Sequence, residues 1–264
     1  MIELVTTEFA SVIPLLAGIK QKVLPKAIYQ GYSPGRIFVD ARENPQLALI
    51  WSAVGYYFLV GDPTQSHDFV DVSRVLTELF VPDSQARGES GFILVPSRGS
   101  WEEHLPSLLP EREVIEIFRR PFQFDAVQFA ALGNWRDRIP PGFQIQIVDA
   151  LLAERIGILA SWCSMDAFLA SGLGYALLHG NEIACACTSV FASHDQMEVD
   201  IHTEEKYQRR GFAKLIASVF IEECLRRGKQ PNWECFWENE PSIALAQKLG
   251  FNAEPDYPVF FWEE

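Results

Sequence analysis

A strand-like segment leads directly into a long amphipathic helix between residues 197 and 227. The segment MEVDIHT (197–203) is typical of a strand, and after a short turn apolar residues recur at spacings of three and four. These residues are Phe212, Leu215, Ile216, Val219, Phe220 and Cys224. Gly228 and Pro231 end the pattern, and a helix with one apolar stripe buries that stripe against another element. This succession predicts an α/β fold.

The rest of the chain continues the alternation of strands and helices. The expected strands are 36–40, 47–53, 56–62, 91–97, 113–120, 142–150, 174–180, 182–192, 232–237 and 257–262, with a hairpin turn at Gly180-Asn181. The expected helices are 66–80, 100–109 with Ser100 as its cap, 165–172, and a short one that Pro241 opens and Gly250 closes. A break at RRPFQFD (119–125) predicts two domains, residues 1–122 and 123–264.

The overall charge limits the partners of this chain. The formal net charge of −13 argues against a general nucleic-acid or anionic-membrane binder, because both would repel the protein except at a local basic patch. The N-terminal residues carry no basic region, and Pro14 interrupts the short apolar stretch 12–19, so neither secretion nor membrane insertion is expected.

Five cysteines, an odd number without a C-x-x-C pair, favour reduced thiols in the cytoplasm. Cys185 and Cys187 would share one strand face, but they supply too few ligands for a metal, so no metal site is predicted.

The turn before the long helix concentrates positive charge in this acidic chain. Residues 206–229 contain seven basic and two acidic residues, a local net charge of +5. The first turn of a helix presents unpaired N–H groups and the positive end of the helix dipole, so a phosphate can bind there. Gly211 lets the main chain approach such a group, and Gln208 supplies a further donor. A solvated basic face is the alternative, while neither the G-x-x-x-x-G-K-[ST] nor the G-x-G-x-x-G pattern is present.

The segment VDIHTEEKYQRRGFAKLIASVFIEECLRRG resembles motif A of the GNAT superfamily of acyl-CoA N-acyltransferases. The motif [QR]-x-x-G-x-[GA] is matched by Gln208, Gly211 and Ala213, and NEPSIALAQKLGF, which begins at Asn239, resembles motif B. The C-terminal half is also similar to a bacterial subfamily of two-domain GNAT proteins through GLGYALL, PNWEC and KLGF.

This resemblance implies a GNAT fold in the C-terminal half, a mixed and largely antiparallel sheet flanked by helices, with an N-terminal α/β domain that is a degenerate GNAT-like half. It also implies acetyl-CoA as the cofactor. The diphosphate of coenzyme A would rest on the main-chain amides of Arg209, Arg210, Gly211, Phe212, Ala213 and Lys214. The pantetheine arm would pair with Ile201 to Thr203 as an added strand, flanked by Asn239 and Ser242.

Acyl transfer to an amine needs a group that accepts the ammonium proton. A strand with period two places Glu198, Asp200 and His202 on one face, and Glu198 is the first choice as the general base, ahead of the other two. A solvated polar face is the alternative for each. The tyrosine that the resemblance implies as acid is replaced by Ala246, so Tyr257, a water, or an unassisted thiolate would complete the reaction.

The sequence therefore predicts an acetyl-CoA-dependent N-acetyltransferase that transfers the acetyl group directly to a small-molecule amine, such as an amino-bearing antibiotic or metabolite. A catalytically silent acyl-CoA sensor is the alternative that Ala246 favours. Protein N-acetylation is the third hypothesis.

Overall fold

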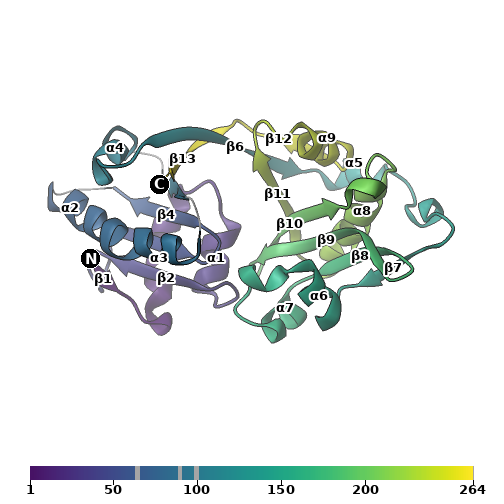
Figure 1. Ribbon diagram of the computed structural model, residues 1–264, viewed down its shortest axis with the longest axis horizontal. Coiled ribbons are helices and arrows are strands. Elements are labelled where there is room, and N and C mark those ends of the chain that lie inside the picture. Colours follow the sequence, from purple (N-terminus) through teal and green to yellow (C-terminus); the bar gives the residue numbers. More distant parts are fainter. Residues whose placement is uncertain (63–65, 89–90, 98–100, 264) are drawn as a thin grey trace. The chain divides into compact units, whose positions relative to one another are not determined.

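The computed structural model describes residues 1–62, 66–88, 91–97 and 101–263. It divides into two compact units, Met1–Arg119 with Tyr257–Glu264, and Arg120–Asp256 (Figure 1). The expected helix cap Ser100 lies outside the described residues.

The first unit is a mixed sheet with helices in its crossover connections. Its strands are β1 (Ile2–Glu3), β2 (Gly35–Val39), β3 (Leu47–Ser52), β4 (Tyr56–Gly61), β5 (Gly91–Pro96), β13 (Tyr257–Glu263) and the first part of β6 (Val114–Phe124). Its helices are α1 (Val23–Tyr29), α2 (Ser66–Val75), α3 (Val81–Ala86) and α4 (Leu105–Leu108), with 3₁₀ segments at Thr6–Gly18 and Glu102–His104. The strand order is β1-β2-β3-β4-β5-β13-β6, in which β4 and β5 are parallel and the other neighbouring pairs are antiparallel.

The helix expected over 66–80 is interrupted by one wider turn. A π-helical turn, Leu76–Phe80, separates α2 from α3 and keeps both of its terminal side chains buried. Pro82 follows it in the first turn of α3. Because a proline has no N–H and its ring clashes with the carbonyl four residues earlier, a regular α-helix could not continue through this position.

The core of the first unit draws on the last strand of the chain. Tyr57, Phe80 and Trp101 belong to one buried cluster that also includes Phe260 and Trp262 of β13. The C-terminal strand therefore packs with the first unit, although its position in the sequence places it after the residues of the second.

The second unit contains the predicted strand–turn–helix. Its strands are the last part of β6, β7 (Phe143–Ile147), β8 (Gly174–His179), β9 (Glu182–Ala192), β10 (Gln196–Thr203), β11 (Gln230–Phe236) and β12 (Phe251–Ala253). Its helices are α5 (Ala126–Ala130), α6 (Ala150–Ile156), α7 (Met165–Ser171), α8 (Phe212–Arg226) and α9 (Glu240–Lys248), with 3₁₀ segments at Arg136–Arg138, Ile158–Ser161 and Glu205–Tyr207. The strand order is β6-β11-β10-β9-β8-β7, and β12 pairs with β6.

Helix α8 packs across β8, β9 and β10 of this sheet. All six apolar residues of its predicted stripe are buried, which confirms the periodicity. Each such side chain contributes about 1.5–3 kcal/mol when it is removed from water. The apolar stripe therefore holds the start of α8 against the sheet, next to the end of β10.

The two units repeat one supersecondary pattern. In the first, antiparallel strands lead to β4, helices follow, and β5 pairs parallel with β4. In the second, antiparallel strands lead to β10, α8 follows, and β11 pairs parallel with β10. The connection after β10 contains Lys206, Arg209 and Arg210, whereas residues 60–68 at the end of β4 and after it contain two aspartates and no lysine or arginine. The two connections therefore differ in the charge of their sequences.

Four cysteines are buried and Cys163 is exposed, and all five are free thiols. In the part of the chain that the structure describes, no helix combines the length and the apolar character that crossing a bilayer requires.

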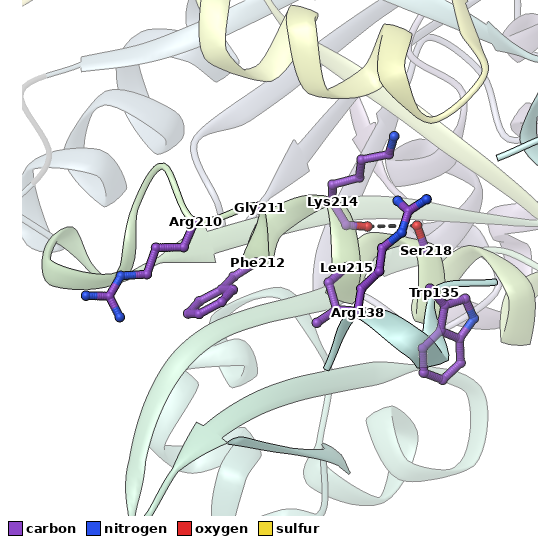
Figure 2. Close-up of a pocket in the computed structure, with 8 residues that line it drawn as sticks. All are labelled: Trp135, Arg138, Arg210, Gly211, Phe212, Lys214, Leu215 and Ser218. Carbon is purple, nitrogen blue, oxygen red and sulfur yellow. Dashed lines mark hydrogen bonds between the residues drawn. The ribbon is translucent and has the colours of Figure 1, made fainter. Parts of the chain in front are cut away.

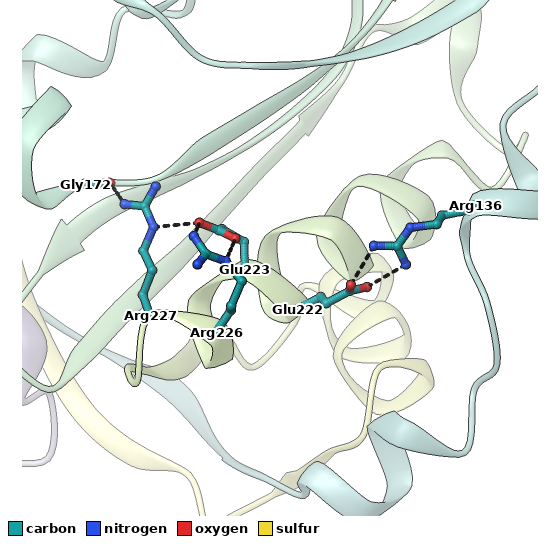
Figure 3. Close-up of polar contacts among 6 residues, drawn as sticks. All are labelled: Arg136, Gly172, Glu222, Glu223, Arg226 and Arg227. Atoms are coloured by element: carbon teal, nitrogen blue, oxygen red, sulfur yellow. Dashed lines mark hydrogen bonds and ion pairs between the residues drawn. The ribbon is translucent and has the colours of Figure 1, made fainter.

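A cluster of charges holds the end of α8. Glu223 accepts hydrogen bonds from Arg226 at 2.6 Å and from Arg227 at 2.9 Å, and Arg227 also donates to the carbonyl of Gly172 at 2.9 Å (Figure 3). These guanidinium groups lower the pKa of the Glu223 carboxyl from 4.5 to about 2. A carboxyl with a lowered pKa stabilises the fold fully above its unfolded value, and this contribution disappears as the pH falls through the folded value.

We expect Glu223→Gln to lower the free energy of unfolding by about 1 kcal/mol at pH 7, a figure reduced for the exposure of the arginines. The difference between variant and wild type should shrink as the pH falls from 4.5 toward 2. Urea unfolding at several pH values measures this difference, with Glu154→Gln at an exposed position of α6 as the control. A difference that stayed constant with pH would show that the ion pairs are not its source.

Candidate cofactor and catalytic site

Strands β10 and β11 pair over a short distance only. Their parallel register joins Gln196, Met197 and Glu198 to Gln230, Pro231 and Asn232. Beyond Glu198, strand β10 continues to Thr203 and stays paired with β9 on its other side. In the described residues, the edge of β10 from Val199 to Thr203 therefore faces no strand on the β11 side.

The open edge exposes the main-chain groups of alternate residues. The N–H of Glu204 donates to the carbonyl of Ala184, so the even-numbered positions of β10 direct their hydrogen bonds toward β9. The odd-numbered positions, which include Ile201 and Thr203, direct theirs toward the open side. Gln208 donates from Nε2 to the Thr203 carbonyl at 3.2 Å, which ties the following turn to this edge.

The connection from β10 to α8 has an unusual backbone. Arg209 has φ of +60° and Gly211 has φ of +81°, both in the left-handed region. A non-glycine residue there is uncommon and is concentrated at functional sites. Gly211 is the N-cap of α8 and has no side chain to accept from the helix, so the first intrahelical bond runs from Leu215 to Gly211 at 3.1 Å. The amide groups of the first helical turn are left for another acceptor.

A pocket lies at this uncapped end of α8 (Figure 2). Its walls combine the turn, the first two turns of α8 and a segment before β7. The lining residues are Trp135, Arg138, Arg210, Gly211, Phe212, Lys214, Leu215 and Ser218. Four of the residues expected at the phosphate turn, Arg210, Gly211, Phe212 and Lys214, thus line one pocket. Of the remaining ones, Gln208 and Arg209 are exposed, and Ala213 is half-buried in the first turn of α8.

Asn239 and Ser242 have structural contacts. Asn239 caps α9 by accepting from the amide of Ser242 at 3.1 Å, and Ser242 Oγ accepts from the indole of buried Trp233 at 3.0 Å. These bonds fix the start of α9 against β11. The expected contact of both residues with pantetheine stays a prediction.

Glu198 lies at the last paired position of β10. Its side chain is 5% exposed, and Oε2 accepts from Nδ2 of Asn232 at 2.5 Å across the strand pair. Next to it the β9 register shifts by one residue, because β9 inserts Val190 between the partners of Glu198 and Val199. The carboxylate is therefore held where the two strands begin to diverge.

The other two expected bases lie in more open surroundings. Asp200 and His202 are both exposed, opposite Thr188 and Ala186 of β9. Although Asp200 is exposed, desolvation by its neighbours raises the pKa of its carboxyl, against the effect of a bond from the Ile201 amide. His202 Nε2 lies 3.7 Å from Glu204 Oε1.

The positions considered for the acid are both buried. Ala246 is fully buried in α9, and Tyr257, 5% exposed, begins β13 and belongs to the first unit.

Three residues of this region were not anticipated from the sequence. Asn232 pairs with Glu198, and Trp135 and Arg138 line the pocket. Asn232 belongs to the family-like segment PNWEC, which was a usable signal, whereas nothing local in the sequence around Trp135 and Arg138 relates them to the turn.

Comparisons with known proteins identify the family of this chain. Residues 13–260 match the family described as GNAT acetyltransferase. An uncharacterized N-acetyltransferase of Bacillus subtilis strain 168, YdfB, is 30% identical over 234 residues, which cover 86% of this chain and 85% of that protein.

Solved structures resemble the chain over nearly its whole length. The GCN5-related N-acetyltransferase-like protein of Streptococcus suis 89/1591 has a TM-score of 0.73 at 24% identity and covers 97% of this chain and 99% of its own. A tandem GNAT protein from the clavulanic acid biosynthesis pathway has a TM-score of 0.61 at 11% identity, covering 99% and 97%. The fold of the whole chain is therefore similar to that of tandem GNAT proteins, and the chain belongs to the GNAT acetyltransferase family.

Proposed function

We propose that this protein is an acetyl-CoA-dependent N-acetyltransferase that acts on a small-molecule amine by direct transfer. The observation that carries the proposal is that the open edge of β10 leads into the uncapped start of α8. The pantetheine arm has amide groups that can pair with the odd-numbered residues of that edge, and its diphosphate requires a dense set of donors. We assign this site to residues 123–264, and residues 1–122 to a GNAT-like half that has no lysine or arginine between residues 60 and 68.

The proposed transfer requires only one proton-accepting side chain. Acetyl-CoA supplies an activated thioester when it is bound. Glu198 is placed to accept a proton from the incoming ammonium, directly or through water, while Asn232 holds the carboxylate. Asp200 and His202 are secondary candidates for the same role.

The buried cysteines of the second unit favour transfer without a covalent intermediate. Burial raises the pKa of the Cys185 thiol to about 11 and that of Cys224 to about 12. A thiol, unlike a thiolate, is a poor nucleophile, so these residues are unsuited to carry the acetyl group. The free thiols also suit a reducing compartment, and we place the protein in the cytoplasm.

A catalytically silent acyl-CoA sensor is the second candidate, because Ala246 offers no hydroxyl group to protonate the leaving thiolate. The test is to mix the protein with acetyl-CoA and a panel of small amines and to measure both binding and the release of free CoA thiol. We expect binding with every mixture and thiol release with a subset of the amines. Binding without amine-dependent release over a broad panel would favour the sensor, and absence of binding would exclude both.

A further inference from the structure

Two cations project into the pocket beyond the phosphate turn. Arg138, from the 3₁₀ segment before β7, and Lys214, from the first turn of α8, both line it together with the buried Ser218 (Figure 2). Lys248 at the end of α9 is close enough that its charge and that of Arg138 lower the pKa of the Lys214 ammonium, although desolvation is the larger cause. Three elements of the second unit therefore bring positive charge to one place.

Arg138, Lys214 and Lys248 form one basic cluster. Throughout residues 1–62, 66–88, 91–97 and 101–263, no carboxylate lies within salt-bridge distance of any of the three. Arg138 donates a hydrogen bond to the carbonyl of Leu132 at 3.1 Å. In a chain with a net charge of −13, the mutual repulsion of three cations that form no salt bridge with the described residues is a cost that a bound anion would remove.

A separate ion pair fixes the segment that carries Arg138. Glu222 of α8 forms a salt bridge with Arg136 at 2.7 Å (Figure 3). It also accepts a hydrogen bond from the indole of Trp135. Arg136 also lies over the ring of Trp135, 4.3 Å from its centroid. The charges of Glu222 and Arg136 therefore satisfy each other, and Arg138, two residues later, is left to face the pocket.

The charge of the cluster suits a phosphomonoester. Such a group carries between −1.5 and −2 charges near pH 7 and three acceptor oxygens, as is known for phosphorylated side chains. Coenzyme A has one phosphomonoester, the 3′-phosphate of its adenosine, in addition to the diphosphate that the amides of the turn would hold. The two kinds of phosphate would then have neighbouring but separate sites.

We propose that Arg138 and Lys214, assisted by Lys248, bind the 3′-phosphate of coenzyme A and make the protein selective for coenzyme A over its 3′-dephospho form. This inference rests on the proposed function, because it uses the same cofactor. The proposal gives a role to Arg138, which lies outside the segments that resemble motifs A and B.

The experiment compares coenzyme A with 3′-dephospho-coenzyme A in calorimetric titrations of the full chain at low ionic strength. The wild type should bind coenzyme A about 10-fold more tightly, as expected when partly exposed cations contribute a few-fold each. Arg138→Gln should reduce this preference by about threefold through weaker binding of coenzyme A alone, and Lys248→Gln should act in the same direction. Added salt should reduce the preference.

Arg155→Gln is the matched control, because Arg155 is also exposed and also donates to a main-chain carbonyl, that of Asn181 at 2.7 Å. It removes the same charge and should leave the preference unchanged. Equal binding of the two ligands by the wild type would overturn this inference while leaving the proposed function intact. An equal loss for both ligands in Arg138→Gln would overturn it as well. Failure of the wild type to bind either ligand would reject the proposed function itself.

Discussion

Replacing Gly211 by glutamate is expected to weaken acetyl-CoA binding by about 100-fold or more, because a carboxylate would stand among the amides that hold the diphosphate and would repel it. Among the described residues other than its chain neighbours and the backbone of its own helix, no atom lies within 4 Å of a Cβ at this position, so the substitution causes no clash at Cβ. The φ of +81° does impose a backbone cost, about 1 kcal/mol. The measurement is a calorimetric titration with acetyl-CoA, together with a thermal melt of each protein.

Gly228→Glu provides a matched control at the other end of the same helix. Gly228 has φ of +71° and likewise has no atom within 4 Å of a Cβ. Both variants should therefore lose similar stability, while only Gly211→Glu should lose affinity. If Gly211→Glu bound acetyl-CoA normally, the diphosphate could not lie on this turn, and the assignment of the whole site would fail.

Glu198→Gln is expected to lower kcat by about 10²- to 10⁴-fold, the usual contribution of a positioned general base. Glutamine has nearly the same shape, so the variant removes the base while it keeps an oxygen that can accept the bond from Asn232. Because the main-chain contacts proposed for the cofactor do not involve this side chain, the affinity for acetyl-CoA should stay within about twofold of the wild type. Steady-state kinetics with an amine found by the thiol-release assay, combined with calorimetry, separates the two quantities.

The controls for this prediction are Asp200→Asn and His202→Gln, because both residues lie on the same strand and both are exposed. We expect each to reduce kcat by less than about 10-fold if Glu198 is the base. A larger effect of Asp200→Asn than of Glu198→Gln would move the role to Asp200. Unchanged kcat in all three variants would mean that β10 does not supply the base.

The repeated strand–helix–strand pattern has a consequence for the number of sites. Both units place a helical connection between two parallel strands, but only the connection after β10 is basic, and the one after β4 carries aspartates. A diphosphate would be repelled by the latter. We therefore expect one molecule of acetyl-CoA per chain.

Local sequence patterns were sufficient to predict much of the second unit. The spacing of Phe212 to Cys224 predicted α8, and the alternation in 197–203 predicted β10, because both depend on neighbours within a few residues. The family resemblance of motifs A and B is confirmed by the match over residues 13–260. The expected acid and base residues and the contacts of Asn239 and Ser242 with the cofactor stay predictions.

By itself, the sequence determined the strand, the turn and the helix that together resemble motif A, since periodicity, a glycine and clustered arginines are short-range signals. Only the tertiary structure decided that β11 leaves β10 after Glu198, that Asn232 holds this carboxylate, that β13 returns to the first unit, and that Arg138 joins Lys214. The physical reason is that each of these contacts joins segments far apart in the chain. Which distant segments come into contact depends on which faces are buried together, and no local pattern of residues encodes that pairing.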